Sequence, residues 1–66
     1  RVNAIAPGMI NTAMTAALSP AVQAQLRASI PLGRFGEPEE VAEAALSLIQ
    51  NAYMTGQVLT IDGGLT

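Results

Sequence analysis

Apolar residues dominate the start of the chain and stop at a proline–glycine pair. Residues 1–6 carry a nearly continuous apolar run, and Pro7-Gly8 interrupts it. Proline removes a hydrogen-bond donor and glycine permits unusual backbone angles, so we expect a strand to end there. A run without polar alternation is typical of a strand covered on both faces, as in a parallel sheet.

The pattern then takes on helical spacing. Thr12 is a candidate N-cap for a helix over residues 13–18, and Ser19-Pro20 predicts the start of a second helix over residues 20–29. The apolar stripe of the second helix recurs at a spacing of four, at Val22, Leu26 and Ile30. A proline and two glycines then break the helical pattern, at Pro31, Gly33 and Gly36.

The strongest helical signal covers residues 38–50. Pro38 occupies a first-turn position, and the acidic residues beside it lie at the positive end of the helix dipole. Apolar residues cover much more than one stripe of this helix, which predicts that it is deeply packed. A loop over residues 51–56 leads to a second buried strand over residues 57–61, and Asp62-Gly63-Gly64 ends that strand.

This order of elements indicates an α/β fold. Two strands joined by a long helical crossover are most simply parallel, with a right-handed connection. A two-stranded parallel sheet is not stable alone, because its strands need neighbours at the open edges and helices on both faces. A length of 66 residues also gives a small core. We therefore expect the chain to be the closing portion of a larger α/β domain.

Composition argues against several classes of function. Three Arg against five acidic residues give a net charge of −2, so nucleic-acid binding is not expected. No run of about 18 apolar residues predicts a membrane span. With no Cys and no His, neither a disulfide nor a zinc site is expected. The chain opens on Arg1 without a targeting signal, and the lack of Cys suits a reducing compartment, so we expect a cytoplasmic location.

The chain offers few groups for acid–base or nucleophilic chemistry, since it has no His, Cys or Lys. The glutamates of the helix over residues 38–50 are interpreted as a solvated helix start rather than a catalytic carboxylate pair. Tyr53 has Gln57 four residues on, so a tyrosine base with a lysine partner at that spacing is excluded. The glycines form no G-x-G-x-x-G loop, and Asp62 is interpreted as a turn-forming residue. No catalytic residue and no metal-binding residue is therefore expected.

One region is harder to explain by structure alone. Pro7-Gly8 lies at the carboxyl end of a predicted parallel strand, where open α/β sheets bind their ligands. Thr12 offers a hydroxyl and heads a helical segment whose N–H groups suit an anion or an amide. A turn followed by a helix cap, without any ligand, accounts for the same residues about as well.

Three segments of the chain resemble the short-chain dehydrogenases/reductases. Residues 1–12 are similar to the family's Asn-x-x-x-Pro-Gly-x-x-x-Thr segment. Residues 30–42 resemble the segment that leads into the family's penultimate helix, and residues 53–64 resemble its last strand with the terminal Asp-Gly-Gly. The resemblance covers nearly the whole chain in register, and three linked motifs at the right spacing make it specific.

The resemblance implies the C-terminal βαβ portion of a Rossmann-type, doubly wound parallel sheet, with residues 1–66 as a fragment of one domain. Residues 1–8 correspond to a strand and its Pro-Gly turn, and residues 9–36 to a substrate loop. Residues 37–50 correspond to the final crossover helix and residues 57–62 to the last strand. The remainder of the domain would then be the chain's partner, and the family's usual assembly implies a homo-oligomer.

The resemblance also implies an NAD or NADP cofactor, without deciding between them, and a small carbonyl or hydroxyl substrate. Pro7 and Gly8 would shape the wall of the nicotinamide pocket. The backbone at Ile10 would bind the nicotinamide carboxamide, and Thr12 would contact the carboxamide or the pyrophosphate.

Residues 13–30 correspond to the family's variable lid over the substrate. Met14 and Leu18, together with Met9 and Val22, would present an apolar face suited to an acyl chain. Packing against the neighbouring helix explains the same side chains about as well.

The family's glycine-rich phosphate loop, its Ser and its Tyr-x-x-x-Lys are absent from this chain, and in the family they lie upstream. The favoured hypothesis is that the chain is part of an NAD(P)-dependent oxidoreductase of the 3-oxoacyl-carrier-protein reductase type, an enzyme of fatty acid biosynthesis. The 66-residue segment alone is expected to be inactive. Sugar, steroid and hydroxyacyl dehydrogenases share the same stretches. The alternative is a truncated, non-catalytic paralogue that serves as an interaction or oligomerisation element through the apolar breadth of residues 41–49.

Overall fold

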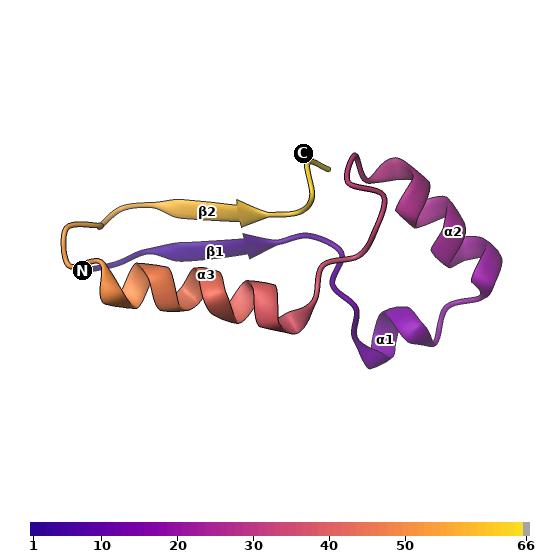
Figure 1. The fold of residues 1–66 in the computed structure, drawn as a ribbon, viewed down its shortest axis with the longest axis horizontal. Coiled ribbons are helices and arrows are strands. Elements are labelled where there is room, and N and C mark those ends of the chain that lie inside the picture. The colour runs from indigo at the N-terminus through magenta and orange to yellow at the C-terminus, as the bar shows by residue number, and fades with distance from the viewer. Residues whose placement is uncertain (66) are drawn as a thin grey trace.

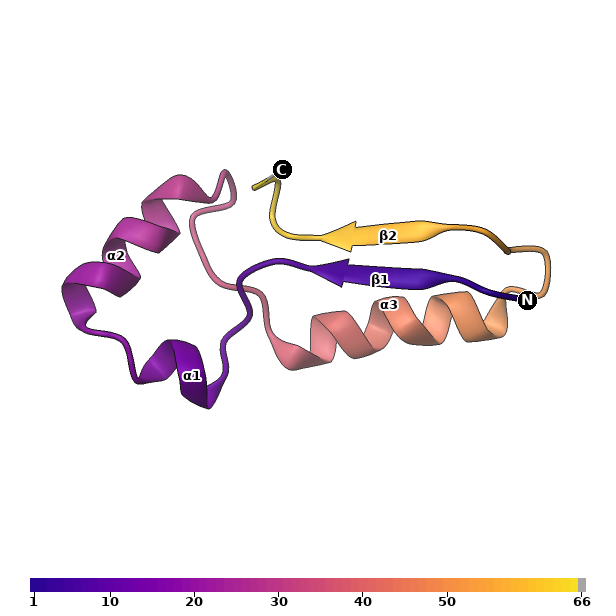
Figure 2. The ribbon, with the colours of Figure 1, turned by 180° about the vertical axis from the view of Figure 1, so that it is seen from behind.

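The computed structural model describes residues 1–65 and shows a strand, three helices and a second strand in that order. The elements are β1 (Ala4–Pro7), α1 (Ala13–Ala16), α2 (Pro20–Ser29), α3 (Pro38–Gln50) and β2 (Val58–Ile61). In Figures 1 and 2 the two strands and α3 form one end of an elongated molecule, and α1 and α2 form a lobe beyond the carboxyl ends of the strands. We call residues 11–35 the helical lobe.

The two strands pair in parallel, as the sequence predicts. Ala4 lies opposite Val58 and Pro7 lies opposite Ile61. The strand includes Pro7, one residue beyond the predicted run. Proline is tolerated there because the neighbouring Gly8 donates its N–H to the Ile61 carbonyl at 3.0 Å, so the ladder to β2 needs no donor from Pro7.

Helix α3 runs along the sheet and packs against both strands. It spans residues 38–50, as the sequence predicts, with proline at its start and Glu37 as its N-cap. Deep packing over a broad face stays a prediction for a larger domain, because this chain alone covers only part of the helix. Leu48 is buried, whereas Leu46 and Ile49 are 50% and 69% exposed. A sheet of two strands covers only one side of the helix, and the remaining apolar side chains stay on the surface.

The side chain of Arg1 holds the end of α3. Its guanidinium donates to the carbonyls of Leu48, Ile49, Asn51 and Met54 at 2.9–3.1 Å. The last carbonyls of a helix have no partner within the helix, and a cation complements the negative end of its dipole. Asn3 adds a hydrogen bond to the Met54 carbonyl at 3.2 Å and accepts the Gln57 N–H at 3.0 Å. The start of the chain therefore fixes the loop between α3 and β2.

The helical lobe departs from prediction only in its first helix. Helix α1 ends at Ala16, whereas the sequence predicts a helix over residues 13–18. The chain must leave the helical conformation early, because Ser19 is extended and caps α2 through a 3.3 Å bond from the Val22 N–H. Neither α1 nor α2 contains a buried residue. The buried side chains near the base of the lobe are Ile30 and Phe35.

The two ends of the helical lobe meet at a short parallel bridge. Ile10 lies opposite Gly36. The Asn11 N–H donates to the Gly36 carbonyl at 2.7 Å, and the Gly36 N–H donates to the Met9 carbonyl at 3.0 Å. This bridge closes the lobe at its base, directly beyond the carboxyl end of β1. Within residues 1–65, no helix is long and apolar enough to cross a membrane.

Candidate functional site

The Pro-Gly turn after β1 lies against the Asp-Gly-Gly turn after β2. A Cβ atom placed on Gly8 would lie 2.6 Å from the Asp62 Cβ and 2.9 Å from its Cα. These distances are far inside normal carbon–carbon contact, so only glycine fits. The Asp62 carboxylate accepts the Gly64 N–H at 3.0 Å, which is the turn-forming interaction that the sequence predicts for this residue.

Ile10 presents its backbone groups away from the bridge. In a parallel bridge the flanking residues make the hydrogen bonds, so the N–H and carbonyl of the bridged residue point to the opposite side. The Ile10 carbonyl accepts a 3.0 Å hydrogen bond from the Thr15 hydroxyl and keeps its second lone pair for a further donor. Its N–H and carbonyl are therefore presented together, on the side of the chain that faces away from Gly36. This arrangement suits a planar amide, which needs one donor and one acceptor.

Thr12 occupies the N-cap of α1 with an extended backbone. Its N–H donates to the Thr15 hydroxyl at 2.8 Å, which is one half of the capping box that Thr12 and Thr15 form. Thr12 as a whole is exposed at the helix start.

The structure brings four of the six expected binding residues into one continuous stretch. Pro7, Gly8, Ile10 and Thr12 run from the end of β1 to the start of α1. Met14 and Leu18 lie in the helical lobe and are 84% and 37% exposed. Because α1 ends at Ala16, Leu18 lies outside the helix and does not continue the helical face that begins at Met14.

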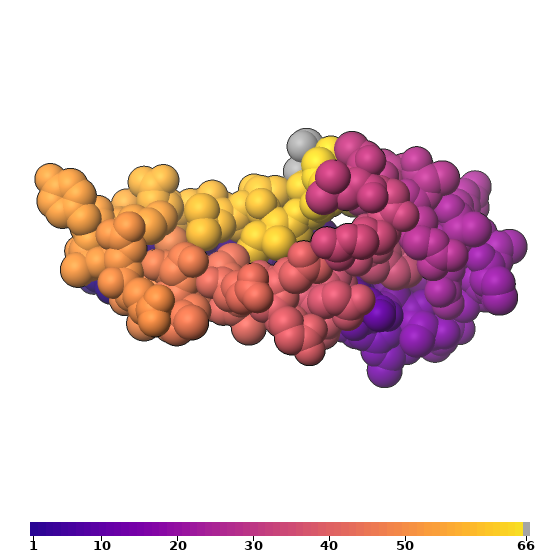
Figure 3. All heavy atoms as spheres, in the orientation of Figure 1, coloured from indigo at the N-terminus to yellow at the C-terminus, as the bar shows by residue number. Residues whose placement is uncertain are grey.

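A pocket of about 440 Å³ lies on the other side of the lobe base. Figure 3 shows the hollow between the end of β2 and the segment that follows α2. Its lining comes from three separated parts of the chain: Met9; the group Pro31, Leu32, Arg34, Gly36 and Glu40; and residues 60–64. None of the six expected binding residues lines it. Sequence reasoning missed this pocket because no local pattern brings residue 9, residue 31 and residue 62 together.

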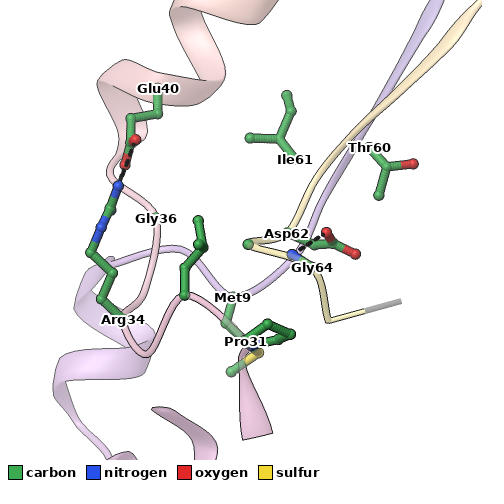
Figure 4. Close-up of a pocket in the computed structure, with 11 residues that line it drawn as sticks. Met9, Pro31, Arg34, Gly36, Glu40, Thr60, Ile61, Asp62 and Gly64 are labelled. Carbon is green, nitrogen blue, oxygen red and sulfur yellow. Dashed lines mark hydrogen bonds and ion pairs between the residues drawn. The ribbon is translucent and has the colours of Figure 1, made fainter. Parts of the chain in front are cut away.

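One edge of the pocket carries an ion pair (Figure 4). Arg34 binds Glu40 through two contacts, Nη1 to Oε1 at 2.8 Å and Nη2 to Oε2 at 2.9 Å. The Glu37 N–H also donates to the Glu40 carboxylate at 2.8 Å. The Arg34 hydrogen bonds and this backbone bond lower the pKa of Glu40 to about 2, and the same pairing raises the pKa of Arg34. Glu40 is therefore a paired helix-capping carboxylate and not simply a solvated one.

Comparison with known proteins agrees with the motifs. The family described as Enoyl-(Acyl carrier protein) reductase matches residues 1–66. The chain belongs to the short-chain dehydrogenase/reductase family. It is 60% identical over 65 residues to carbonyl reductase family member 4 of Danio rerio, and 54% identical over 67 residues to the 3-oxoacyl-[acyl-carrier-protein] reductase FabG of Thermotoga maritima. These alignments take in 98% of this chain but only 26% and 27% of the relatives, so the chain spans about a quarter of their length.

Solved structures of the short-chain dehydrogenase/reductase family share the arrangement. A 3-oxoacyl-[acyl-carrier protein] reductase from Brucella melitensis matches with a TM-score of 0.91 and 45% identity, over 98% of this chain and 25% of that one. A small-chain dehydrogenase in complex with NADPH matches with a TM-score of 0.84 and 39% identity, over 98% of this chain and 32% of that one. The predicted fold class is confirmed: the chain is a βαβ portion of a Rossmann-type α/β sheet, with helices between its two parallel strands.

Within residues 1–65, no group of three or more Asp, Glu, His or Cys side chains is placed to hold a metal ion. Arg34 and Glu40, two ionisable groups with a shifted pKa, bind each other at the pocket edge. What this short-chain dehydrogenase/reductase segment offers is therefore backbone hydrogen-bonding groups, one threonine hydroxyl and an exposed apolar lobe.

Proposed function

We propose that residues 1–66 form one portion of a single Rossmann-type domain in an NAD(P)-dependent oxidoreductase. The complete enzyme would transfer a hydride between nicotinamide and a carbonyl or hydroxyl substrate. Membership of the short-chain dehydrogenase/reductase family supports this proposal, as does the similar dehydrogenase that was solved with NADPH. A sheet of two strands, with only Ile30, Phe35 and Leu48 buried among the described hydrophobic residues, supports the need for a larger domain.

The observation that carries the proposal is the backbone geometry at Ile10. Its N–H and carbonyl lie on the side opposite Gly36, just beyond the carboxyl end of β1. That edge is where open parallel sheets bind nucleotides. When bound, the nicotinamide nucleotide supplies the redox chemistry. In this proposal Pro7 and Gly8 form the wall beside its ring, Ile10 holds the carboxamide, and Thr12 donates a further hydrogen bond.

The helical lobe serves as the substrate lid in this proposal. Met14 and Leu18 present apolar surface that lies outside the described core. An apolar lid suits an acyl chain, and relatives named 3-oxoacyl-[acyl-carrier-protein] reductase favour a 3-oxoacyl thioester as substrate. The 66 residues contain no His, Cys or Lys, so the proposal assigns proton transfer to residues outside this segment. Its partners are then the remainder of the domain and other copies in a homo-oligomer.

The first test is turnover by the complete protein. We expect it to oxidise NADPH or NADH in the presence of a 3-oxoacyl thioester. The loss of absorbance of the reduced nicotinamide measures this reaction. Binding of neither nucleotide would overturn the proposed function. Binding of neither nucleotide by a protein that still forms oligomers would favour the alternative, a non-catalytic interaction element.

The second test is Thr12→Val in the complete protein. Loss of one hydrogen bond worth about 0.5–1.5 kcal/mol predicts a rise in nucleotide Kd of about two- to tenfold. Thr55→Val is the matched control, because Thr55 bonds the Val2 N–H in the loop at the opposite end of the strands. Nucleotide fluorescence titration measures both. If Thr12→Val leaves affinity and turnover unaltered, Thr12 does not bind the nicotinamide nucleotide.

A further inference from the structure

The helical lobe has few attachments to the rest of the molecule. The main packing between elements joins β1, β2 and α3. Figures 1 and 2 show α1 and α2 standing beyond the ends of the strands, so the position of the lobe depends on its base. One part of this base is the bridge between Ile10 and Gly36. Beside it, Asn11 donates to the Glu37 carboxylate at 3.4 Å and Arg34 pairs with Glu40, so both ends of the lobe are also joined to the start of α3.

The other part of the base is the Asp62-Gly63-Gly64 turn. The Leu32 N–H donates to the Gly63 carbonyl at 3.1 Å. A Cβ atom on Gly63 would lie 2.9 Å from Cγ2 of Ile30, and one on Gly64 would lie 3.1 Å from Cγ of Pro31. Ile30 is only 3% exposed, so it has little room to move away. Pro31 and Gly64 both line the pocket (Figure 4).

The same turn also touches the end of β1. Asp62 lies so close to Gly8 that no Cβ atom fits between them. The three residues of the turn therefore contact, on one side, the wall proposed for the nicotinamide and, on the other, the segment that ends the lobe. Gly8 meets the Cα and Cβ of Asp62, and Gly63 meets Cγ2 of the buried Ile30, so rotation of a flexible side-chain end relieves neither contact and a displacement is transmitted.

We propose that the Asp62-Gly63-Gly64 turn is a positioning element that sets the helical lobe relative to the Pro7-Gly8 turn through the contact of Gly63 with Ile30. This inference rests on the proposed function, because it assigns the lobe the role of substrate lid. Gly63 and Gly64 touch no reacting atom in this account. They act through Ile30 and Pro31 on where Met14 and Leu18 lie over the substrate.

The test compares alanine at glycines that share a backbone conformation but differ in their surroundings. Gly63 and Gly56 have φ angles of +63° and +69°, so alanine is strained to a similar degree at both. Around Gly56, however, no atom lies within 4 Å of the added Cβ, whereas Gly63 meets Ile30. Gly63→Ala and Gly56→Ala in the complete protein therefore separate the contact with the lobe from backbone strain.

The first readout is hydrogen–deuterium exchange of peptides from residues 13–29 without ligand, which does not depend on the proposed activity. We expect faster exchange in Gly63→Ala and wild-type exchange in Gly56→Ala. The second readout is kinetic. A misplacement of substrate-positioning groups by about 1 Å can lower the reaction rate by up to 10²-fold. We therefore expect kcat/KM for the carbonyl substrate to fall about tenfold in Gly63→Ala, mainly because KM rises, while the nucleotide Kd stays unchanged.

Two further variants keep the test decisive. Ile30→Leu moves the branch of the side chain from Cβ to Cγ and so removes Cγ2 at nearly constant volume. The double variant Gly63→Ala/Ile30→Leu should therefore regain the hydrogen exchange and the KM of the wild type. Should Gly63→Ala not fold, Gly64→Ala imposes the milder 3.1 Å contact with Pro31 and should show the same two effects in smaller measure. If the folded variants match Gly56→Ala in both readouts, the turn does not position the lobe. If the wild-type protein shows no turnover, the proposed function is refuted. The exchange data would still show whether the Asp62-Gly63-Gly64 turn positions the helical lobe.

Discussion

The contact between the two turns leads to a stability prediction for Gly8→Ala. The added Cβ would lie 2.6 Å from the Asp62 Cβ and 2.9 Å from the Asp62 Cα. Carbon atoms prefer a separation of about 3.5 Å or more, so one atom pair would overlap by nearly 1 Å. The obstacle is backbone and the first side-chain atom, so no change of rotamer relieves it. The ends of β1 and β2 must separate, and the 3.0 Å bond from the Gly8 N–H to the Ile61 carbonyl must lengthen.

The magnitude follows from two opposing effects. Overpacking of this kind costs about 1–3 kcal/mol. Gly8 does not have a positive φ, so alanine fits its backbone and gains about 0.4–1 kcal/mol by restricting the unfolded chain. We therefore expect the free energy of unfolding to fall by about 1–2 kcal/mol.

Gly36→Ala provides the matched control. It also lacks a positive φ, and its added Cβ would meet an atom at 3.0 Å. That atom is Cδ1 of Ile10, the far end of a flexible side chain, which can turn aside. We expect a change within about 0.5 kcal/mol for this variant. Urea unfolding of the complete protein, followed by circular dichroism, measures both changes. Equal stability of the two variants would show that the Gly8–Asp62 approach does not limit the residue at position 8.

Two further predictions concern the ends of α3. Because the pKa of Glu40 is lowered in the folded state, from 4.5 to about 2, its contribution to stability is complete above about pH 4.5 and is lost as the pH falls towards 2. In Glu40→Gln, Tm should fall less steeply than in the wild type as the pH decreases from about 4.5 to 2. Arg1→Ala should destabilise the complete protein by about 1–3 kcal/mol in urea, because the guanidinium bonds four carbonyls in the last turn of α3 and the loop after it.

Each of these has its own control. Glu39→Gln removes a first-turn charge from the same helix without touching Arg34, so it should leave the acid limb of the Tm profile as steep as in the wild type. An equally flat profile for Glu39→Gln would mean that general charge, and not the ion pair, produces the pH dependence. Arg1→Lys keeps the charge but not the planar fork, so it should retain part of the stability. If Arg1→Lys and the wild type are equally stable, charge alone holds the helix end.

The elements that carry local signals were predictable from the sequence. Helix α2 begins at Pro20 behind the Ser19 cap, and α3 begins at Pro38, because each start is encoded within a few residues. The first helix was predicted too long for a related reason. Nothing after Ala16 marks its end except the cap of the next helix, and that cap requires an extended Ser19.

Contacts between distant residues were not predictable in this way. The guanidinium of Arg1 bonds carbonyls about 50 positions away, and only the parallel pairing of β1 with β2 brings them together. The ion pair of Arg34 with Glu40 escaped notice because Arg34 precedes the helix, so the usual helical spacings of three and four do not apply. The Glu40 side chain therefore looked like one of several solvated carboxylates.

The glycines illustrate the difference between a motif and its cause. The sequence shows Pro7-Gly8 and Asp62-Gly63-Gly64 as two turns, each sufficient to end a strand. The structure gives Gly8 a different reason, since its φ is not positive and the space for a Cβ is occupied by Asp62. Gly63 combines both reasons, a positive φ and a close approach to Ile30. The Pro7-Gly8 and Asp62-Gly63-Gly64 turns are separate motifs in the sequence but contact each other in the structure. A change in either turn is therefore expected to disturb the other.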